Sequence, residues 1–138
     1  MRAMLLVLLL AGCAAPELAL EKLPPPRGPS GVVVIVRPSA FIGNEGAYVV
    51  NIDRRDVHAM EAKEHIRVRL DPGTHRIALR CWRPALAEWA ETAITHEVVG
   101  GATTYLRVVP RHSCAQLEPL AESAARSLAV GTVFRPLQ

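Results

Sequence analysis

Short apolar segments with turn residues between them constrain the fold of this chain more than any other feature of its sequence. Between residues 32 and 109, runs rich in Val, Ile, Leu and Thr alternate with polar residues, and Gly, Pro, Asn and Asp lie between the runs. Alternation favours β-strands, because successive side chains of a strand point to opposite faces of a sheet. The segments expected to be strands are 32–36, 48–53, 65–70, 75–82, 92–99 and 103–109. They predict a mainly β chain that forms an antiparallel β-sandwich.

The first of these segments, 32–36, differs from the others because it is β-branched without interruption. Such a run is typical of a strand that is buried on both faces. Arg37-Pro38 follows it, and a proline disfavours continuation of the strand. We therefore expect a central strand that ends at this point.

The residues Asp71-Pro72-Gly73-Thr74 predict a tight turn between two strands. Pro sets φ at the first central position of such a turn, and Gly accepts a positive φ at the second. If the flanking strands pair as a hairpin, their apolar residues share one face and four arginines share the other: Arg67, Arg69, Arg76 and Arg80. Like charges on one face need either nearby carboxylates or an anionic ligand, so this set is a candidate anion-binding surface.

The carboxyl-terminal part of the chain changes to a helical spacing. Beyond Pro119, the residues Leu120, Ala124 and Leu128 recur at the spacing of one helix face. Glu122 and Arg126 are four residues apart and can form an ion pair on a helix. We expect one helix here, docked on the sandwich, with a possible edge strand at 133–136.

The amino-terminal residues predict where the protein is located. Arg2 precedes an apolar run over residues 3–11, far shorter than the roughly 20 residues that a helix needs to cross a bilayer. The run ends in Leu10-Ala11-Gly12-Cys13, which resembles the lipobox of bacterial lipoproteins. The resemblance implies that residues 1–12 are removed and that Cys13 is acylated, so that a covalent lipid holds the protein to a membrane. The alternative is an ordinary secretory signal with a cysteine in its cleavage zone.

The residues after Cys13 extend this interpretation. Ala14, in place of an Asp, implies by the same resemblance the periplasm-facing side of the outer membrane, with the cell membrane as the fallback location. The segment 13–31 contains Pro24-Pro25-Pro26 and is expected to be a stiff tether, because proline runs favour an extended conformation. The segment 32–138 is expected to form one domain, the sandwich with its helix.

The two remaining cysteines, Cys81 and Cys114, are an even pair in an exported protein, where disulfides persist. A bridge between them would close a loop of about 33 residues. The alternative is two buried free thiols, because sequence alone does not show whether their Cβ atoms approach each other.

A second resemblance covers the central strands. The residues that carry it are Tyr48-Val49-Val50-Asn51-Ile52-Asp53, then Val57, Met60, Val68, Leu70, Pro72-Gly73 and His75. Their order resembles PEGA-like sandwich domains and an uncharacterised family of bacterial envelope lipoproteins, over about 80 residues when the strand near 104–107 is included. The chain departs from that pattern at Arg54, His58 and Lys63, where turn glycines are expected, and at His65, where an aromatic is expected. The resemblance implies an immunoglobulin-like or prealbumin-like sandwich and brings no catalytic residues.

Two further groups of residues are weaker candidates for binding. His58, Glu61 and His65 would share one face and could hold a metal if the segment 56–65 were helical, but a hairpin would scatter them, and we expect no metal site. Trp82 and Trp89 flank a loop, where indole rings can stack on a sugar or enter a partner's pocket, or can instead cover one end of the core.

The sequence contains none of the zinc, nucleophile or phosphate-binding motifs that identify common enzymes. Its formal net charge of +3 is small and does not suggest nucleic-acid binding. We therefore expect a non-enzymatic lipoprotein with no cofactor besides its lipid, which acts as a structural or protein-interaction module of the envelope. The alternative is a binding module for an anionic or saccharide component of the cell wall or lipid, through the arginines or the tryptophans, and an enzyme with a histidine-based site is a third, weaker hypothesis.

Overall fold

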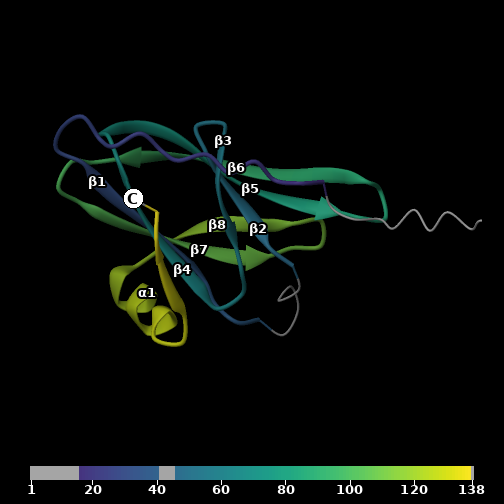
Figure 1. Cartoon of the computed structure of the whole chain (residues 1–138). Helices are drawn as coiled ribbons and strands as arrows, with labels where there is room; N and C mark the ends of the chain where they lie inside the picture. The colour runs from purple at the N-terminus through teal and green to yellow at the C-terminus, as the bar shows by residue number, and fades with distance from the viewer. Residues whose placement is uncertain (1–15, 41–45, 138) are drawn as a thin grey trace, which may run out of the picture.

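Nine strands and one helix follow one another in the part of the chain that this computed structural model describes, residues 16–40 and 46–137 (Figure 1). The elements are β1 (Gly31–Arg37), β2 (Tyr48–Ile52), β3 (Arg55–Met60), β4 (Glu64–Leu70), β5 (Gly73–Arg83), β6 (Glu88–Val98), β7 (Thr103–Pro110), β8 (Ala115–Leu120), α1 (Glu122–Ala129) and β9 (Val133–Pro136). The predicted mainly β chain with one helix near its carboxyl end is confirmed. Cys13 lies outside the described residues.

The strands form two sheets that enclose one core. One sheet has the strand order β8-β7-β1-β4-β9, and the other has the order β3-β2-β5-β6. The core receives side chains from both sheets, among them Val33, Ile66 and Leu106 from the first and Ile52 and Leu79 from the second, all fully buried. The burial of these apolar side chains holds the two sheets together.

Two strand pairs are parallel, which corrects the expectation of a wholly antiparallel fold. β1 pairs in parallel with β7, and β4 pairs in parallel with β9. The antiparallel expectation depended on tight turns between strands that are neighbours in sequence. All four strands of the second sheet lie between β1 and β7 in the sequence. No tight turn therefore connects β1 to β7 or sets the direction of β7.

The predicted hairpin around the turn at 71–74 is also wrong. β4 pairs with β1, where Val68 lies opposite Val33, and β5 pairs with β2, where Ile77 lies opposite Ile52. The turn therefore carries the chain from one sheet to the other, and Gly73 has a φ of 128° there. The physical reason is that both edges of β4 are occupied, one by β1 and the other by β9, so β5 finds its hydrogen-bonding neighbours in the other sheet.

The segment 56–65 is not a helix, so the alternative that placed three metal ligands on one helix face is wrong. Its first part belongs to β3, and its last residues begin β4. Lys63 turns the chain with a φ of 58°, and the backbone N–H of Glu61 donates to the Glu64 carboxylate at 2.8 Å. A side-chain acceptor that closes a turn in this way competes with a helix.

The helix α1 begins at Glu122, later than predicted, because the residues up to Leu120 belong to β8. Its ion pair between Glu122 and Arg126 is confirmed, with the Arg126 Nε atom 3.0 Å from the carboxylate. Ala125 is the residue that the helix buries. Among the described residues, no helix is both long and apolar enough to cross a bilayer. The strand at 133–136 is confirmed as an edge strand beside β4.

Cys81 and Cys114 form a disulfide, as the pairing of the two cysteines predicted, and their Cα atoms are 5.5 Å apart. Cys81 lies in β5 of the four-stranded sheet, and Cys114 immediately precedes β8 of the five-stranded sheet. The bridge therefore joins the two sheets at the end of the body where β5 and β6 are connected.

Removal of this bridge is expected to destabilise the fold. The paired substitution Cys81→Ala with Cys114→Ala should lower the free energy of unfolding by about 3–4 kcal/mol, the chain-entropy value for a loop of this length. Urea unfolding of the variant and of the oxidised wild type at equal protein concentration measures the difference. An unfolding midpoint that does not change, either in the variant or in reduced wild type, would contradict a formed bridge.

The proline-rich segment 16–30, which we call the strap, lies along the body and is not a free spacer, which corrects the tether predicted for this part of the chain. The Glu21 N–H donates to the Asp56 carbonyl oxygen at 2.7 Å, and the Arg27 N–H donates to the Asp71 carboxylate at 2.9 Å. Leu23 packs against the core. Composition indicated an extended segment, and the apolar contact and the hydrogen bonds hold that segment on the surface (Figure 1).

Candidate functional site

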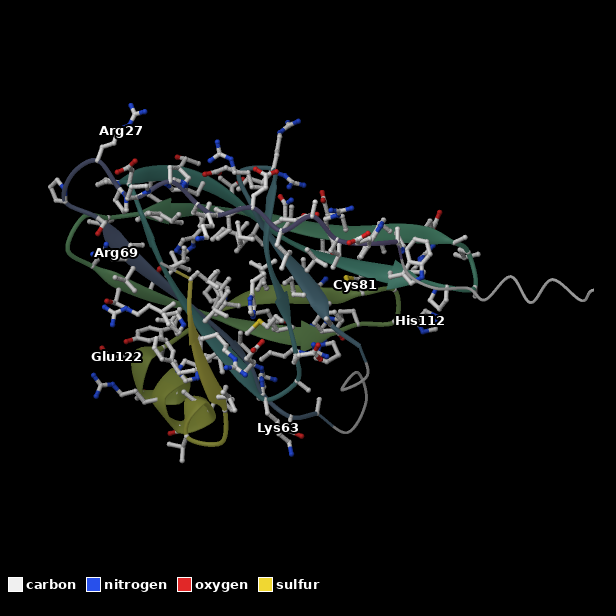
Figure 2. The ribbon with its side chains drawn as sticks, in the orientation of Figure 1. Arg27, Lys63, Arg69, Cys81, His112 and Glu122 are labelled. Carbon is white, nitrogen blue, oxygen red and sulfur yellow. A yellow bond between two sulfur atoms is a disulfide. The ribbon has the colours of Figure 1, made fainter. Side chains whose placement is uncertain are left out.

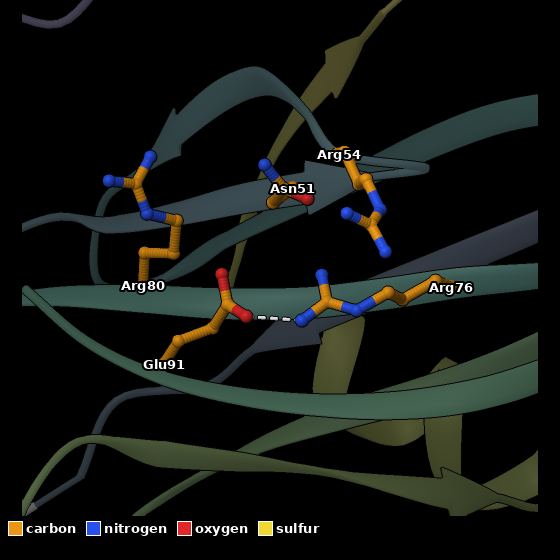
Figure 3. Close-up of a pocket in the computed structure, with 5 residues that line it drawn as sticks. All are labelled: Asn51, Arg54, Arg76, Arg80 and Glu91. Carbon is orange, nitrogen blue, oxygen red and sulfur yellow. Dashed lines mark hydrogen bonds and ion pairs between the residues drawn. The ribbon is translucent and has the colours of Figure 1, made fainter.

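A polar pocket of about 420 Å³ opens on the outer face of the four-stranded sheet (Figure 3). Its lining consists of Asn51, Arg54, Arg76, Arg80 and Glu91, and we call it the arginine pocket. Three of its residues come from β5 and β6, one from β2 and one from the turn after β2. Three cationic side chains in one depression are a concentration of charge that the rest of the chain does not balance locally, so this pocket is the candidate site.

The strand register explains why a depression forms here. Ile77 and Leu79 point into the core, so the residues between and beside them in β5 point outward. In that outward row, Ala78 lies directly opposite Ala93 of β6. Arg80 lies opposite Glu91 in the next outward pair. The short side chains of this alanine pair, next to the long polar side chains that line the pocket, leave room for a depression on this face.

Arg54 enters the pocket from an unusual backbone position. Asp53 and Arg54 connect β2 and β3 with φ values of 48° and 69°. This two-residue turn favours Asn or Gly, and an arginine in the left-handed region costs about 1–2 kcal/mol. Among the described residues, no hydrogen bond or ion pair compensates the Arg54 side chain, and Figure 3 shows its guanidinium group beside that of Arg76. A strained and uncompensated cation at the rim of a pocket is typical of a functional position.

The other two arginines of the pocket are paired. Arg76 forms an ion pair with Glu91, shown in Figure 3, and Arg80 forms one with Asp56 of β3. The pocket and its immediate surroundings therefore hold three guanidinium groups against two carboxylates. The excess of one positive charge favours an anionic ligand, and guanidinium groups bind carboxylate or phosphate with paired hydrogen bonds.

Asn51 adds an unfilled hydrogen-bonding position to this charge. Its Nδ2 atom donates to the Asp56 carboxylate at 2.7 Å, which orients the side-chain amide. Its Oδ1 atom is buried and accepts no hydrogen bond from the described residues. A buried acceptor without a donor is unfavourable by about 1–3 kcal/mol, so a hydroxyl group of a ligand would be stabilised here.

Two tryptophans extend the site along the same face. Trp82 lies opposite Trp89 in the register of β5 and β6, and their ring centroids are 5.5 Å apart. The guanidinium carbon of Arg80 lies 4.8 Å from the centroid of the Trp89 ring. Both tryptophans are strand residues on the outer face, so the expectation of loop residues is corrected, and neither belongs to the core cluster.

The four arginines predicted to share one face do not come together. Arg67 and Arg69 belong to β4 in the five-stranded sheet, and Arg76 and Arg80 belong to β5 in the other sheet. The cause is the turn at 71–74, which passes between the sheets. Sequence reasoning missed Arg54, whose only signal was its place in a turn where glycine is expected.

The residues once considered for a metal have other partners. His58 Nε2 lies 3.0 Å from the Glu64 carboxylate, and Arg135 Nε lies 3.1 Å from the same group. Burial of Glu64 works to raise its pKa, but the hydrogen bonds from His58, the Glu61 N–H and Arg135 outweigh burial and lower that pKa. In the ranges 16–40 and 46–137, no three His, Cys, Asp or Glu side chains gather as a metal would require.

A histidine holds the turn that carries Arg54. His75 Nδ1 lies 2.7 Å from the Asp53 carboxylate, and its Nε2 lies 2.7 Å from the Asp71 carbonyl oxygen. The same Asp53 carboxylate accepts the Arg76 N–H at 3.0 Å. Burial of His75 works to lower its pKa, but its hydrogen bonds to Asp53 and Asp71 raise that pKa above the ordinary value of 6.5. The protonated ring donates at both nitrogens and ties the β2–β3 turn to the start of β5.

Comparison of the chain with protein-family models, curated proteins and solved structures finds no significant match. The chemistry of the site therefore rests on its own geometry. A depression with one excess positive charge, a buried acceptor and neighbouring indole rings fits an anion that also carries hydroxyl groups.

The contribution of His75 to stability should depend on pH. Because its folded pKa is raised, the stabilisation is fully present below pH 6.5 and is lost as the pH rises through the folded pKa. Urea unfolding of wild type and of His75→Asn at pH 6 and pH 8.5 tests this. The difference in stability between the two proteins should shrink at the higher pH, and an unchanged difference would show that His75 does not titrate in this way.

Proposed function

We propose that this protein is a bacterial envelope lipoprotein held by acyl chains on Cys13, on the periplasm-facing side of the outer membrane. The lipobox-like residues before Cys13 and the disulfide, a bond typical of exported proteins, support this location. We further propose that its two sheets form a sandwich of the immunoglobulin or prealbumin type, related to PEGA-like domains. In this proposal the protein is not an enzyme and acts by binding.

The role that the geometry supports best is the binding of an anionic, hydroxyl-bearing envelope component in the arginine pocket. The observation that carries this proposal is the combination of the uncompensated Arg54 with the buried, unfilled Oδ1 atom of Asn51. A sugar acid or a phosphorylated sugar has both complementary groups, an anion for the guanidinium groups and a hydroxyl for the amide oxygen. Trp89, next to Arg80, offers apolar surface to the faces of the sugar rings.

Titration of the full-length protein in detergent with peptidoglycan fragments and with lipopolysaccharide tests this role. Arg54→Ser should lower the affinity for the ligand by about 10- to 100-fold, the value of a lost hydrogen bond to a charged group. Arg67→Ser removes the same charge from the other sheet and is the matched control. Glu91→Gln should raise the affinity, because it removes the carboxylate that competes for Arg76. Equal affinities of the Arg54 and Arg67 variants would contradict binding in the pocket.

A second candidate role is recruitment of an extended segment of a partner protein. Its support is β6, an 11-residue strand at the edge of its sheet. An edge strand offers backbone groups that can pair with another chain. A photo-crosslinking residue at the exposed Thr95 of β6 should capture a partner in intact cells, whereas one at Arg67 should not. Equal capture at both positions would contradict recruitment at this edge.

A further inference from the structure

The strap determines the direction in which the chain leaves the body toward Cys13. Its later part lies at the end of the body where β5 begins, because the Arg27 N–H bonds to Asp71. Its middle lies beside β3, because the Glu21 N–H bonds to the Asp56 carbonyl oxygen. The strap therefore runs opposite to β5, and its amino end points to the end of the body where β5 and β6 are joined. Figure 1 shows the purple start of the strap on that side of the body.

The length of chain before the strap is short. Two residues separate Cys13 from Pro16, and a fully extended chain spans at most about 11 Å over the three steps between their Cα atoms. Asp56, beside Glu21, is ion-paired with Arg80, which lies three residues before the end of β5. From Arg80 to that end, β5 extends by about 10 Å in the same direction as the amino end of the strap. The strap therefore begins, at Pro16, near the β5–β6 turn, so a lipid on Cys13 would hold this end of the body to the membrane.

The surface at this end, which we call the hairpin end, has the side chains that favour a membrane–water boundary. A groove of about 450 Å³ lies between the β5–β6 turn and the β7–β8 turn. It is lined by Tyr48, Trp82, Pro84, Leu86, Arg111 and His112, together with neighbouring residues of both turns. Figure 2 shows His112 at this end, beyond Cys81. Aromatic and arginine side chains stabilise the headgroup layer of a bilayer by placing apolar parts inward and polar parts in water.

Two exposed leucines lie along this same path. Leu86 at the turn is 60 % exposed, and Leu20 in the strap is 48 % exposed. The disulfide between Cys81 of β5 and Cys114 of the β7–β8 turn lines this groove and joins the two sheets there, so it restrains the surface. This apolar turn on a restrained base lies next to the proposed lipid anchor. The bilayer is therefore the one surface that the turn can always contact.

We propose that the hairpin end rests on the bilayer, with Leu86 in the headgroup layer. This orientation rests on the proposed acylation of Cys13. β5 then stands away from the membrane surface, and the arginine pocket opens sideways, parallel to the bilayer. The turn at 71–74 is the part of the body farthest from the lipid.

Quenching of tryptophan emission by brominated lipids tests the orientation. The full-length protein is purified from bacterial membranes, and its intact mass reports the acyl groups. It is then placed in vesicles of phosphatidylethanolamine and phosphatidylglycerol, with and without lipids brominated near the headgroup. A reporter is added as Leu86→Trp at the hairpin end. The matched controls are Val99→Trp near the opposite end and Val130→Trp after α1, which replace valines that are 59 % and 88 % exposed.

With the native Trp82 and Trp89 replaced by Phe in all three variants, we expect a larger fractional loss and a blue shift of emission for Leu86→Trp than for either control. If the three variants are lipidated and are quenched equally, or if Val130→Trp is quenched most, the proposed orientation is wrong, although the lipid anchor is present. A mass without acyl groups overturns the anchor and, with it, the orientation.

Discussion

The pairing of β1 with a strand on each side is the constraint on which the rest of the structure depends. β1 carries fully buried apolar residues, and its backbone groups lie where water cannot satisfy them. β4 and β7 supply the missing hydrogen bonds, one antiparallel and one parallel. β4 pairs with β1 on one edge and with β9 on the other, so the strand that follows it has no free edge of β4 and joins the other sheet. The two-sheet arrangement, the inter-sheet turn at 71–74 and the separation of the arginines all follow from this pairing.

The arginine pocket is a consequence of where the second sheet places small and large side chains. Its lining consists of Asn51, three arginines and Glu91, and the short side chains of Ala78 and Ala93 form a neighbouring pair in the register. Asp56 links several of these side chains, since it pairs with Arg80 and orients Asn51. The chain thus holds its cations with carboxylates on the outer face and leaves one of them, Arg54, uncompensated. Such an arrangement keeps a binding surface ordered without neutralising it.

The strap links the proposed lipid anchor at Cys13 to the orientation of the folded body. Its composition alone indicates a spacer, but its contacts with β3 and with Asp71 hold it on the body, so few residues separate Cys13 from the part of the chain that lies on the body. A short connection restricts how far and in which directions the body can turn above the membrane. The anchor, the hairpin end and the sideways opening of the arginine pocket are therefore parts of one geometric arrangement.

The sequence by itself determined the local features of this protein. Alternation identified six of the nine described strands but neither β3 nor β8. The helical spacing identified α1 with its pair of Glu122 and Arg126, and the even cysteine count identified the disulfide. Each of these follows from residues that are close in sequence or from simple counting. The tertiary structure alone decided which strands pair, and hence that Arg54, and neither Arg67 nor Arg69, joins Arg76 and Arg80. The reason is physical: alternation states which side chains of one strand share a face, but the neighbours of a strand depend on which distant apolar residues it is buried against.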